Sequence, residues 1–94
     1  MAMKTKFYVG DRVRVVDVQD ALYESVGKEG TVVRVYHQEN GMPDNVVVRF
    51  DERFSDRLHS GRIGDTTRCC WNIPDDKLTF VLSPISFEDV TDLL

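Results

Sequence analysis

The residues best suited to chemistry are arginines, and they are concentrated in one stretch of the chain. Between positions 49 and 68 every Lys or Arg residue is an arginine: Arg49, Arg53, Arg57, Arg62 and Arg68. The planar guanidinium donates paired hydrogen bonds to carboxylates and phosphates, so this cluster is suited to binding an anion. His59 would add a positive charge below about pH 6.5. Gly61 and Gly64 would let the backbone approach that anion closely.

The same stretch has a simpler interpretation, in which its arginines pair with acidic neighbours in solvent. The acidic residues among them are Asp51, Glu52, Asp56 and Asp65. Five arginines against four acids leave residues 49–68 with a net charge of +1. Both interpretations stay open from the sequence, and the anion of the first would belong to nucleic acid, a nucleotide or an acidic protein surface.

Aromatic side chains form a second candidate site, because such residues can build a stacking surface or a peptide-docking groove. The candidates are Phe7, Tyr8, Tyr23, Tyr36, Phe54 and Trp71. Trp71, close to Pro74, is also typical of packing in a closing strand. We therefore predict a partner-binding site made of Tyr23, Arg53, Phe54, Arg57, Arg62 and Trp71.

Residues for catalysis or metal binding are not recognisable, and we predict no enzyme, no cofactor and no metal. No nucleophile stands beside a base at a known spacing, and no G-x-x-x-x-G-K-S/T phosphate loop occurs. The adjacent Cys69 and Cys70 are poorly placed for a disulfide. They predict reduced thiols in a cytoplasmic protein, one of them a small core residue. A zinc site would need about four ligands, and His37 and His59 lie far off in sequence.

The chain has 94 residues and a mass of 10.8 kDa, which predicts one small domain without a deep substrate cleft. Hydrophobic residues make up 41% of it, too many for a disordered chain, and no apolar run approaches the ~20 residues of a membrane helix. The net charge is −4 and comes from residues 71–94, whereas residues 1–70 are neutral. A domain that binds duplex nucleic acid usually has a clear basic excess, which this chain lacks.

The arginine stretch lies between segments with strand character. Residues 7–18 include an alternation of apolar and charged side chains, which predicts Val13 and Val15 facing a core and Arg12 and Arg14 facing solvent. Further strands are predicted at residues 31–36, 46–50, 69–73 and 77–82. The connections predicted between them are a loop or single helical turn at 19–25, turns at 26–30, 38–45 and 74–76, and a long loop at 51–68.

Two details of this pattern carry specific expectations. The glycines of the 26–30 turn, Gly27 and Gly30, indicate positive φ or a close approach of another backbone. The loop at 51–68 exceeds the ~12–15 residues beyond which loops of compact domains are usually functional or mobile. The sequence therefore predicts an all-β fold of about five antiparallel strands, arranged as a small barrel.

The last residues predict a short amphipathic helix. Ser86 would cap it, Asp89 would complete a capping box, and an apolar face would be formed by Phe87, Val90, Leu93 and Leu94. This acidic extension would dock on its own barrel, on a second copy of the chain or on a basic partner.

The motifs resemble those of KOW-type and related SH3-like barrels. Gly10-Asp11 opens the first strand, a Gly27-x-x-Gly30-x-Val32 turn leads into the second, and residues 46–51 read V-V-V-R-F-D. Residues 70–78, with Trp71, Pro74 and Leu78, resemble the closing strand of small SH3-like proteins of phages and bacterial mobile elements. The resemblance covers roughly residues 7–82, and we predict an SH3-like barrel over residues 1–82 with an acidic extension at 83–94. The loop at 51–68 and this extension are not part of the common pattern.

Because SH3-like barrels bind RNA, DNA, peptides and proteins alike, the resemblance does not by itself fix a function. We predict a non-enzymatic, cytoplasmic protein-binding module without membrane contact, of the kind a phage would use to engage a host factor. The alternative is KOW-type nucleic-acid binding through Arg12, Arg14, Arg34 and the loop arginines. A third hypothesis is sequestration of a small phosphorylated ligand, and homo-oligomerisation through the extension stays open.

Overall fold

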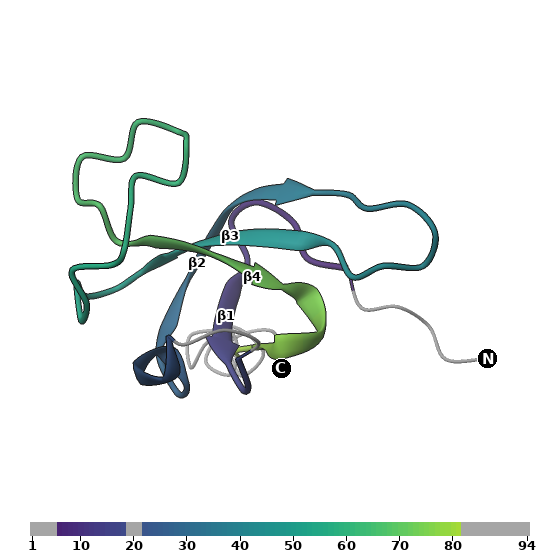
Figure 1. Cartoon of the computed structure of the whole chain (residues 1–94), viewed down its shortest axis with the longest axis horizontal. Helices are drawn as coiled ribbons and strands as arrows, with labels where there is room; N and C mark the ends of the chain where they lie inside the picture. The colour runs from purple at the N-terminus through teal and green to yellow at the C-terminus, as the bar shows by residue number, and fades with distance from the viewer. Residues whose placement is uncertain (1–5, 19–21, 82–94) are drawn as a thin grey trace, which may run out of the picture.

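The computed structural model describes residues 6–18 and 22–81, and it consists mainly of β-strands (Figure 1). The strands are β1 (Arg12–Val15), β2 (Glu29–Tyr36), β3 (Asn45–Phe50), β4 (Cys70–Pro74) and β5 (Leu78–Phe80). Two short 3₁₀ turns, η1 (Tyr23–Ser25) and η2 (Asp75–Lys77), are the helical elements of this part of the chain. The strands form one open antiparallel sheet in the order β4-β3-β2-β1-β5, so the predicted mainly-β fold of five strands is confirmed.

Some predicted boundaries were wrong. Glu29 and Gly30 belong to β2 rather than to a turn, because they pair with Arg14 and Val13 of β1. The last strand begins at Leu78, because the preceding residues form η2. The predicted C-terminal helix and the extension at 83–94 lie outside the described residues. None of the helices in the described part of the chain is long and apolar enough to cross a membrane.

The side chains of β1 alternate between the core and solvent, as predicted. Val13 and Val15 are fully buried, whereas Arg14 is exposed and Arg12 is partly exposed.

Gly27 and Gly30, the two glycines after η1, have the roles that their positions in the sequence indicated. Gly27 has a φ of +85°, and a Cβ on Gly30 would lie 2.4 Å from the carbonyl oxygen of Arg49 in β3. Only a residue without a side chain allows β2 and β3 to approach this closely.

One apolar core is shared by all five strands. Its members include Val13 from β1, Val32 from β2, Val48 from β3, Ile73 from β4 and Leu78 from β5. Phe7, Leu22 and Leu58, which lie outside the strands, complete the cluster. The sheet therefore bends around side chains from both of its ends, and Figure 1 shows this bend most clearly along β2.

The connection between β3 and β4 is partly folded onto the sheet. Leu58 is buried in the core. His59 and Cys70 exchange backbone hydrogen bonds, each with N···O of 2.9 Å, so His59 extends the sheet beyond β4. Gly61 packs against Cys70 and Val47, where a Cβ would come within 3.0 Å of both side chains. These contacts cover the outer face of the sheet at β3 and β4.

The connection between β2 and β3 lies at the opposite end of the sheet (Figure 1). It is held at its base by Asp44, whose carboxylate accepts the backbone N–H of Gln38 at 3.0 Å and lies 3.0 Å from Nδ1 of His37. The backbone N–H of Asp75 donates to the carbonyl oxygen of Asp44, which ties this connection to η2.

Candidate functional site

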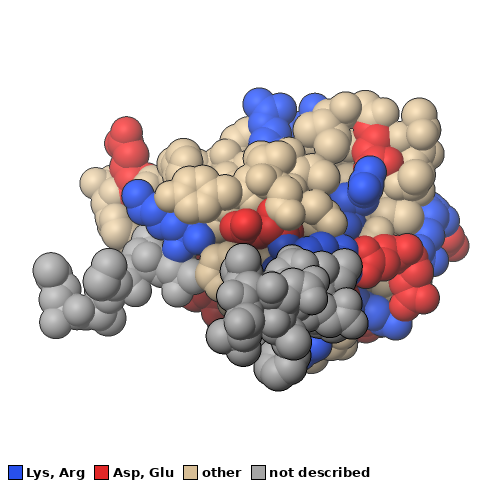
Figure 2. Space-filling view, turned by 180° about the vertical axis from the view of Figure 1, so that it is seen from behind, with Lys and Arg blue, Asp and Glu red and all other residues tan. Residues whose placement is uncertain are grey.

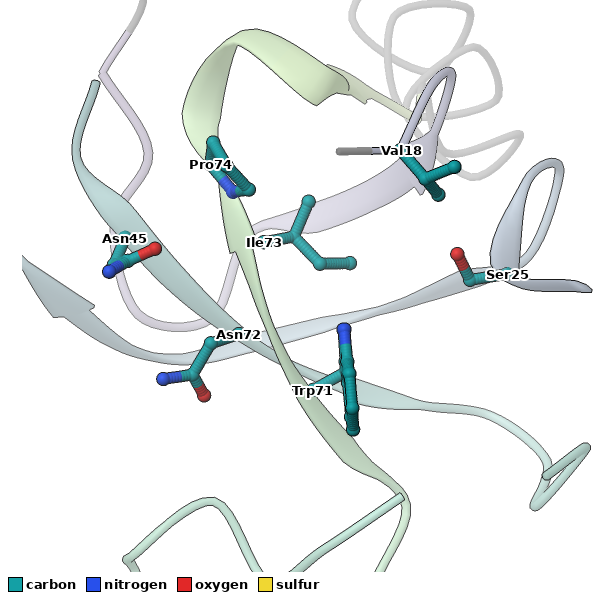
Figure 3. Close-up of a pocket in the computed structure, with 7 residues that line it drawn as sticks. All are labelled: Val18, Ser25, Asn45, Trp71, Asn72, Ile73 and Pro74. Carbon is teal, nitrogen blue, oxygen red and sulfur yellow. The ribbon is translucent and has the colours of Figure 1, made fainter. Parts of the chain in front are cut away.

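A groove runs beside Trp71 across the end of the sheet where β3 begins and β4 ends. One hollow is lined by Val18, Ser25, Asn45, Trp71, Asn72, Ile73 and Pro74 (Figure 3). A second hollow is lined by Gln38, Met42, Pro43, Asn45 and Pro74. Because the two hollows share Asn45 and Pro74, we treat them as one surface, called the Trp71 groove below. None of its lining residues is charged.

The strand pattern of β4 explains how Trp71 reaches this groove. Trp71 and Ile73 lie opposite Val48 and Val46 of β3, on the core face of the sheet. Trp71 is only partly buried, because it stands where the core opens to solvent. Figure 3 shows its ring nitrogen directed toward the space between Ile73, Val18 and Ser25. Trp71 thus forms a wall of the groove as well as packing against the core.

The η1 turn positions the opposite wall. Ser25 is buried, and its hydroxyl donates a 2.7 Å hydrogen bond to the carbonyl oxygen of Leu22. Leu22 is itself a core residue, so Ser25 is fixed to the domain interior. Tyr23, in the same turn, is 72% exposed and does not line the groove.

The edge of β4 that does not pair with β3 is covered only in part by the β3–β4 connection. The N–H and C=O groups of Cys70 point away from β3, since both bond to His59. Alternation along a strand directs the backbone groups of Asn72 to the same side. Within the described residues no hydrogen bond to this side of Asn72 is found.

Two side chains of the β3–β4 connection contact Trp71. The ring of His59 lies 5.4 Å from the Trp71 ring, at an interplanar angle of 38°. The guanidinium of Arg57 lies 6.0 Å from the centroid of the same ring. The connection therefore reaches the groove, and the structure brings together Arg57 and Trp71 of the predicted site.

The other predicted site residues are more dispersed. Phe54 is partly buried, with its ring edge-on to that of Phe50 at 4.9 Å. Arg53 donates to the carboxylate of Asp56 at 2.9 Å. Arg62 is exposed and has a φ of 59°, a left-handed conformation that favours glycine.

Sequence reasoning missed His59 as a contact of Trp71 and the uncharged residues that line the groove. Met42, 59% exposed, and Pro43 belong to a segment interpreted only as a turn. Asn45 and Asn72 are isolated polar residues without a motif. An apolar Met42 next to Pro43 in a predicted turn was the sequence signal that could have added this segment to the site.

The outer face of β1 and β2 carries a set of ion pairs, called the paired face below. Arg12 donates to both carboxylate oxygens of Asp51, at 2.7 and 2.6 Å, and Arg14 donates to Glu29, at 2.7 and 3.0 Å. Lys28 pairs with Glu52 at 2.7 Å. The hydrogen bond from Arg12 lowers the pKa of Asp51 below its ordinary value. Figure 2, seen from behind, shows basic and acidic side chains interleaved on the surface.

The pKa of His59 is lowered, mainly by burial and further by the positive charges of Arg62 and Arg68. His59 therefore takes up its positive charge only at a pH below the expected value of about 6.5. Its Nδ1 accepts the backbone N–H of Gly61 at 2.9 Å. The proton of the neutral ring consequently resides on Nε2.

Both cysteines carry free thiols, and both are buried, whereas only one was predicted to be in the core. Burial, together with the neighbouring Asp65, raises the pKa of the Cys70 thiol to about 11. Cys70 is therefore a poor nucleophile at neutral pH. No group of three or more His, Cys, Asp or Glu residues suited to a metal ion occurs in the described ranges 6–18 and 22–81.

Comparisons with protein-family models, with curated proteins and with solved structures found no match.

Proposed function

We propose that this chain is a non-enzymatic protein-binding module that holds an extended segment of a partner protein in the Trp71 groove. The observation that carries the proposal is the chemistry of that groove, where an aromatic wall is combined with Met42, Pro43 and Pro74 and no lining residue is charged. Apolar and amide groups suit a peptide, whose backbone needs hydrogen-bond partners and whose side chains need apolar contacts. The free backbone groups of Asn72 supply such hydrogen bonds at the edge of β4.

We also propose that the sheet closes into an SH3-like barrel, as the sequence resemblance implies. The shared core supports this, because β1, β5 and β4 all direct side chains into the same cluster although they lie at opposite ends of the strand order. Only the η2 turn separates β4 from β5 along the chain. In such a barrel the Trp71 groove would lie where the two ends of the sheet meet.

Nucleic-acid binding is the weaker alternative. Two of the arginines invoked for it, Arg12 and Arg14, are neutralised by the carboxylates of Asp51 and Glu29. A third, Arg34, stacks over Tyr36 at 4.8 Å. Phosphate contacts require cations that can exchange their partners for the backbone of the nucleic acid, and the paired face offers few of these.

The test is affinity capture from cell lysate with the tagged full chain, with and without nuclease, followed by mass spectrometry. Three baits are compared: the wild type, Met42→Asp, which places a charge in the groove, and Tyr8→Ser, which changes an exposed aromatic residue outside it. We expect one protein to be retained by the wild type and Tyr8→Ser at ~300 mM salt after nuclease treatment, and to be lost from Met42→Asp.

Two outcomes would contradict the proposal. Equal retention of the protein by all three baits would mean that it binds elsewhere. Recovery of nucleic acid, with proteins lost on nuclease treatment, would support the KOW-type alternative, and binding should then weaken steeply between ~50 and ~200 mM salt.

A further inference from the structure

The arginines of this molecule divide into those whose side chains have a carboxylate or aromatic partner and those whose side chains have neither. Arg12, Arg14, Arg49 and Arg53 have carboxylate partners, and Arg34 and Arg57 lie over aromatic rings. Within the described residues, the side chains of Arg62 and Arg68 have neither an ion pair nor a ring contact, and both are exposed. These two, called the unpaired arginines below, carry charge that nothing in this part of the chain neutralises.

Their acidic neighbours in sequence are occupied elsewhere. Asp51 and Glu52 are bound by Arg12 and Lys28 of the paired face. The carboxylate of Asp65 is turned inward, with a side chain only 5% exposed, and accepts hydrogen bonds from Thr67 and Cys70. The near-neutral balance of residues 49–68 therefore conceals a local positive surface.

The unpaired arginines flank His59, whose ring lies tilted against that of Trp71. Arg62 follows Gly61, whose backbone N–H donates to Nδ1 of His59. Arg68 is two residues before Cys70, whose backbone exchanges hydrogen bonds with His59. The lowered pKa of His59 agrees with this placement, since both arginines contribute to it. The positive surface thus adjoins the Trp71 end of the groove.

Both arginines also adopt left-handed backbone conformations, with φ of 59° at Arg62 and 53° at Arg68. Glycine occupies such conformations at lower cost than arginine. The chain therefore has arginine where folding alone would favour glycine, which gives a clean way to remove the charges without harming the fold.

We propose that Arg62 and Arg68 form an anion subsite at the His59 end of the Trp71 groove, which binds an Asp or Glu side chain of the partner segment. The inference rests on the proposed function, because the groove holds the segment and the subsite selects its charge. A carboxylate there would accept hydrogen bonds from guanidinium groups, and the Nε2–H of neutral His59 provides a further donor.

The experiment selects peptides from a randomised dodecapeptide display library on three full-length proteins. They are the wild type, the double variant Arg62→Gly/Arg68→Gly, and the control Arg14→Gln/Arg34→Gln, which removes the same charge from the sheet. Thermal unfolding first establishes that each is folded. We expect acidic residues at a fixed spacing from an apolar or aromatic residue in peptides selected by the wild type and the control, and not in those selected by the double variant.

Affinity then gives a direct measure. Replacing the acidic residue of a selected peptide by its amide should weaken binding to the wild type about tenfold, the scale of one charge-assisted hydrogen-bond pair, and should scarcely change binding to the double variant. Peptides selected by the wild type without any acidic preference, or the same preference in the double variant, would overturn the subsite alone. Failure of the folded wild type to select any peptide would count against the groove itself.

Discussion

The paired face and the unpaired arginines contain the same residue type in opposite situations. On the sheet, Arg12 and Asp51 are 39 positions apart in sequence, yet strand register brings them into a two-point contact. In the connection, Arg62 has acidic residues close in sequence and pairs with none of them within the described residues. Strand register, rather than local charge balance, therefore decides which cations are available to a partner.

The largest effect is expected where a substitution disturbs the register of β2 and β3. Gly30→Ala should destabilise the domain by about 3 kcal/mol, because the new Cβ would overlap the carbonyl oxygen of Arg49 and force β2 from β3. Chemical denaturation measures this loss. Gly41→Ala is the control for glycine loss without a close contact, since Gly41 has a φ of +74° but open space around it, and it should cost only about 1 kcal/mol. Equal losses would show that the close approach at Gly30 is unimportant.

A second prediction compares the stability of two variants, each of which replaces one arginine, from the paired face in one and from the unpaired arginines in the other. Arg12→Gln should lower the free energy of unfolding by about 1 kcal/mol or less, because it breaks an exposed ion pair. Arg62→Gly should leave stability unchanged or raise it slightly, because glycine relieves the left-handed conformation. Equilibrium unfolding of the two variants in parallel provides the measurement. A larger loss from Arg62→Gly than from Arg12→Gln would reverse the assignment of structural and available charges.

The pH dependence of stability should separate the two regions. The pKa of His59 is lowered in the folded state, so the unfolded chain takes up its proton first and stability declines as the pH falls below about 6.5. The pKa of Asp51 is lowered too, so its contribution is complete above about pH 4 and is lost as the pH falls through its folded value.

Melting temperatures should therefore decline modestly in two steps, an upper one as the pH falls below about 6.5 and a lower one as it falls below about 4. His59→Gln should flatten the upper step and Asp51→Asn the lower one. If His59→Gln leaves the slope between pH 7 and 5 unchanged, the histidine is not held neutral by its surroundings.

The smallest expected effect is one of reactivity. Cys70 lies under the connection, and its raised pKa and burial should protect it from a thiol reagent in the native protein at pH 7. Time-resolved labelling, with full reaction in denaturant as the reference, measures this protection. Rapid native labelling of Cys70 would mean that the connection lifts readily from the sheet and that the subsite is not preformed.

The sequence predicted the sheet well because strands with one buried face alternate visibly. Val13 and Val15 were placed correctly, and so were the roles of Gly27 and Gly30. Docking of the β3–β4 connection was not predictable, because Leu58 and Ile63 are the two aliphatic residues of a polar stretch, show no periodicity, and only Leu58 is buried. The mainly-β class and the strand count therefore followed from local pattern, whereas coverage of the outer face required the tertiary structure.

The candidate site was harder to predict than the fold. Its walls come from four separate segments of the chain, and residues such as Asn45 and Asn72 carry no motif. Trp71 was identified because tryptophan is rare and conspicuous, and Arg57 and Arg62 because arginines cluster. The ion pair between Asp51 and Arg12 could not be predicted from the sequence, because it depends on the pairing of strands that are far apart along the chain.

The burial of Leu58 divides the long β3–β4 connection into two short spans. Each span closes as an ordinary short loop. The entropy lost on closing the connection is therefore smaller than the entropy expected for one loop of its full length. The span beyond His59 carries the exposed Arg62 and Arg68, whose side chains can be substituted without moving the anchor at Leu58. Leu58 thus acts as an internal fixed point that shortens the connection without shortening the chain.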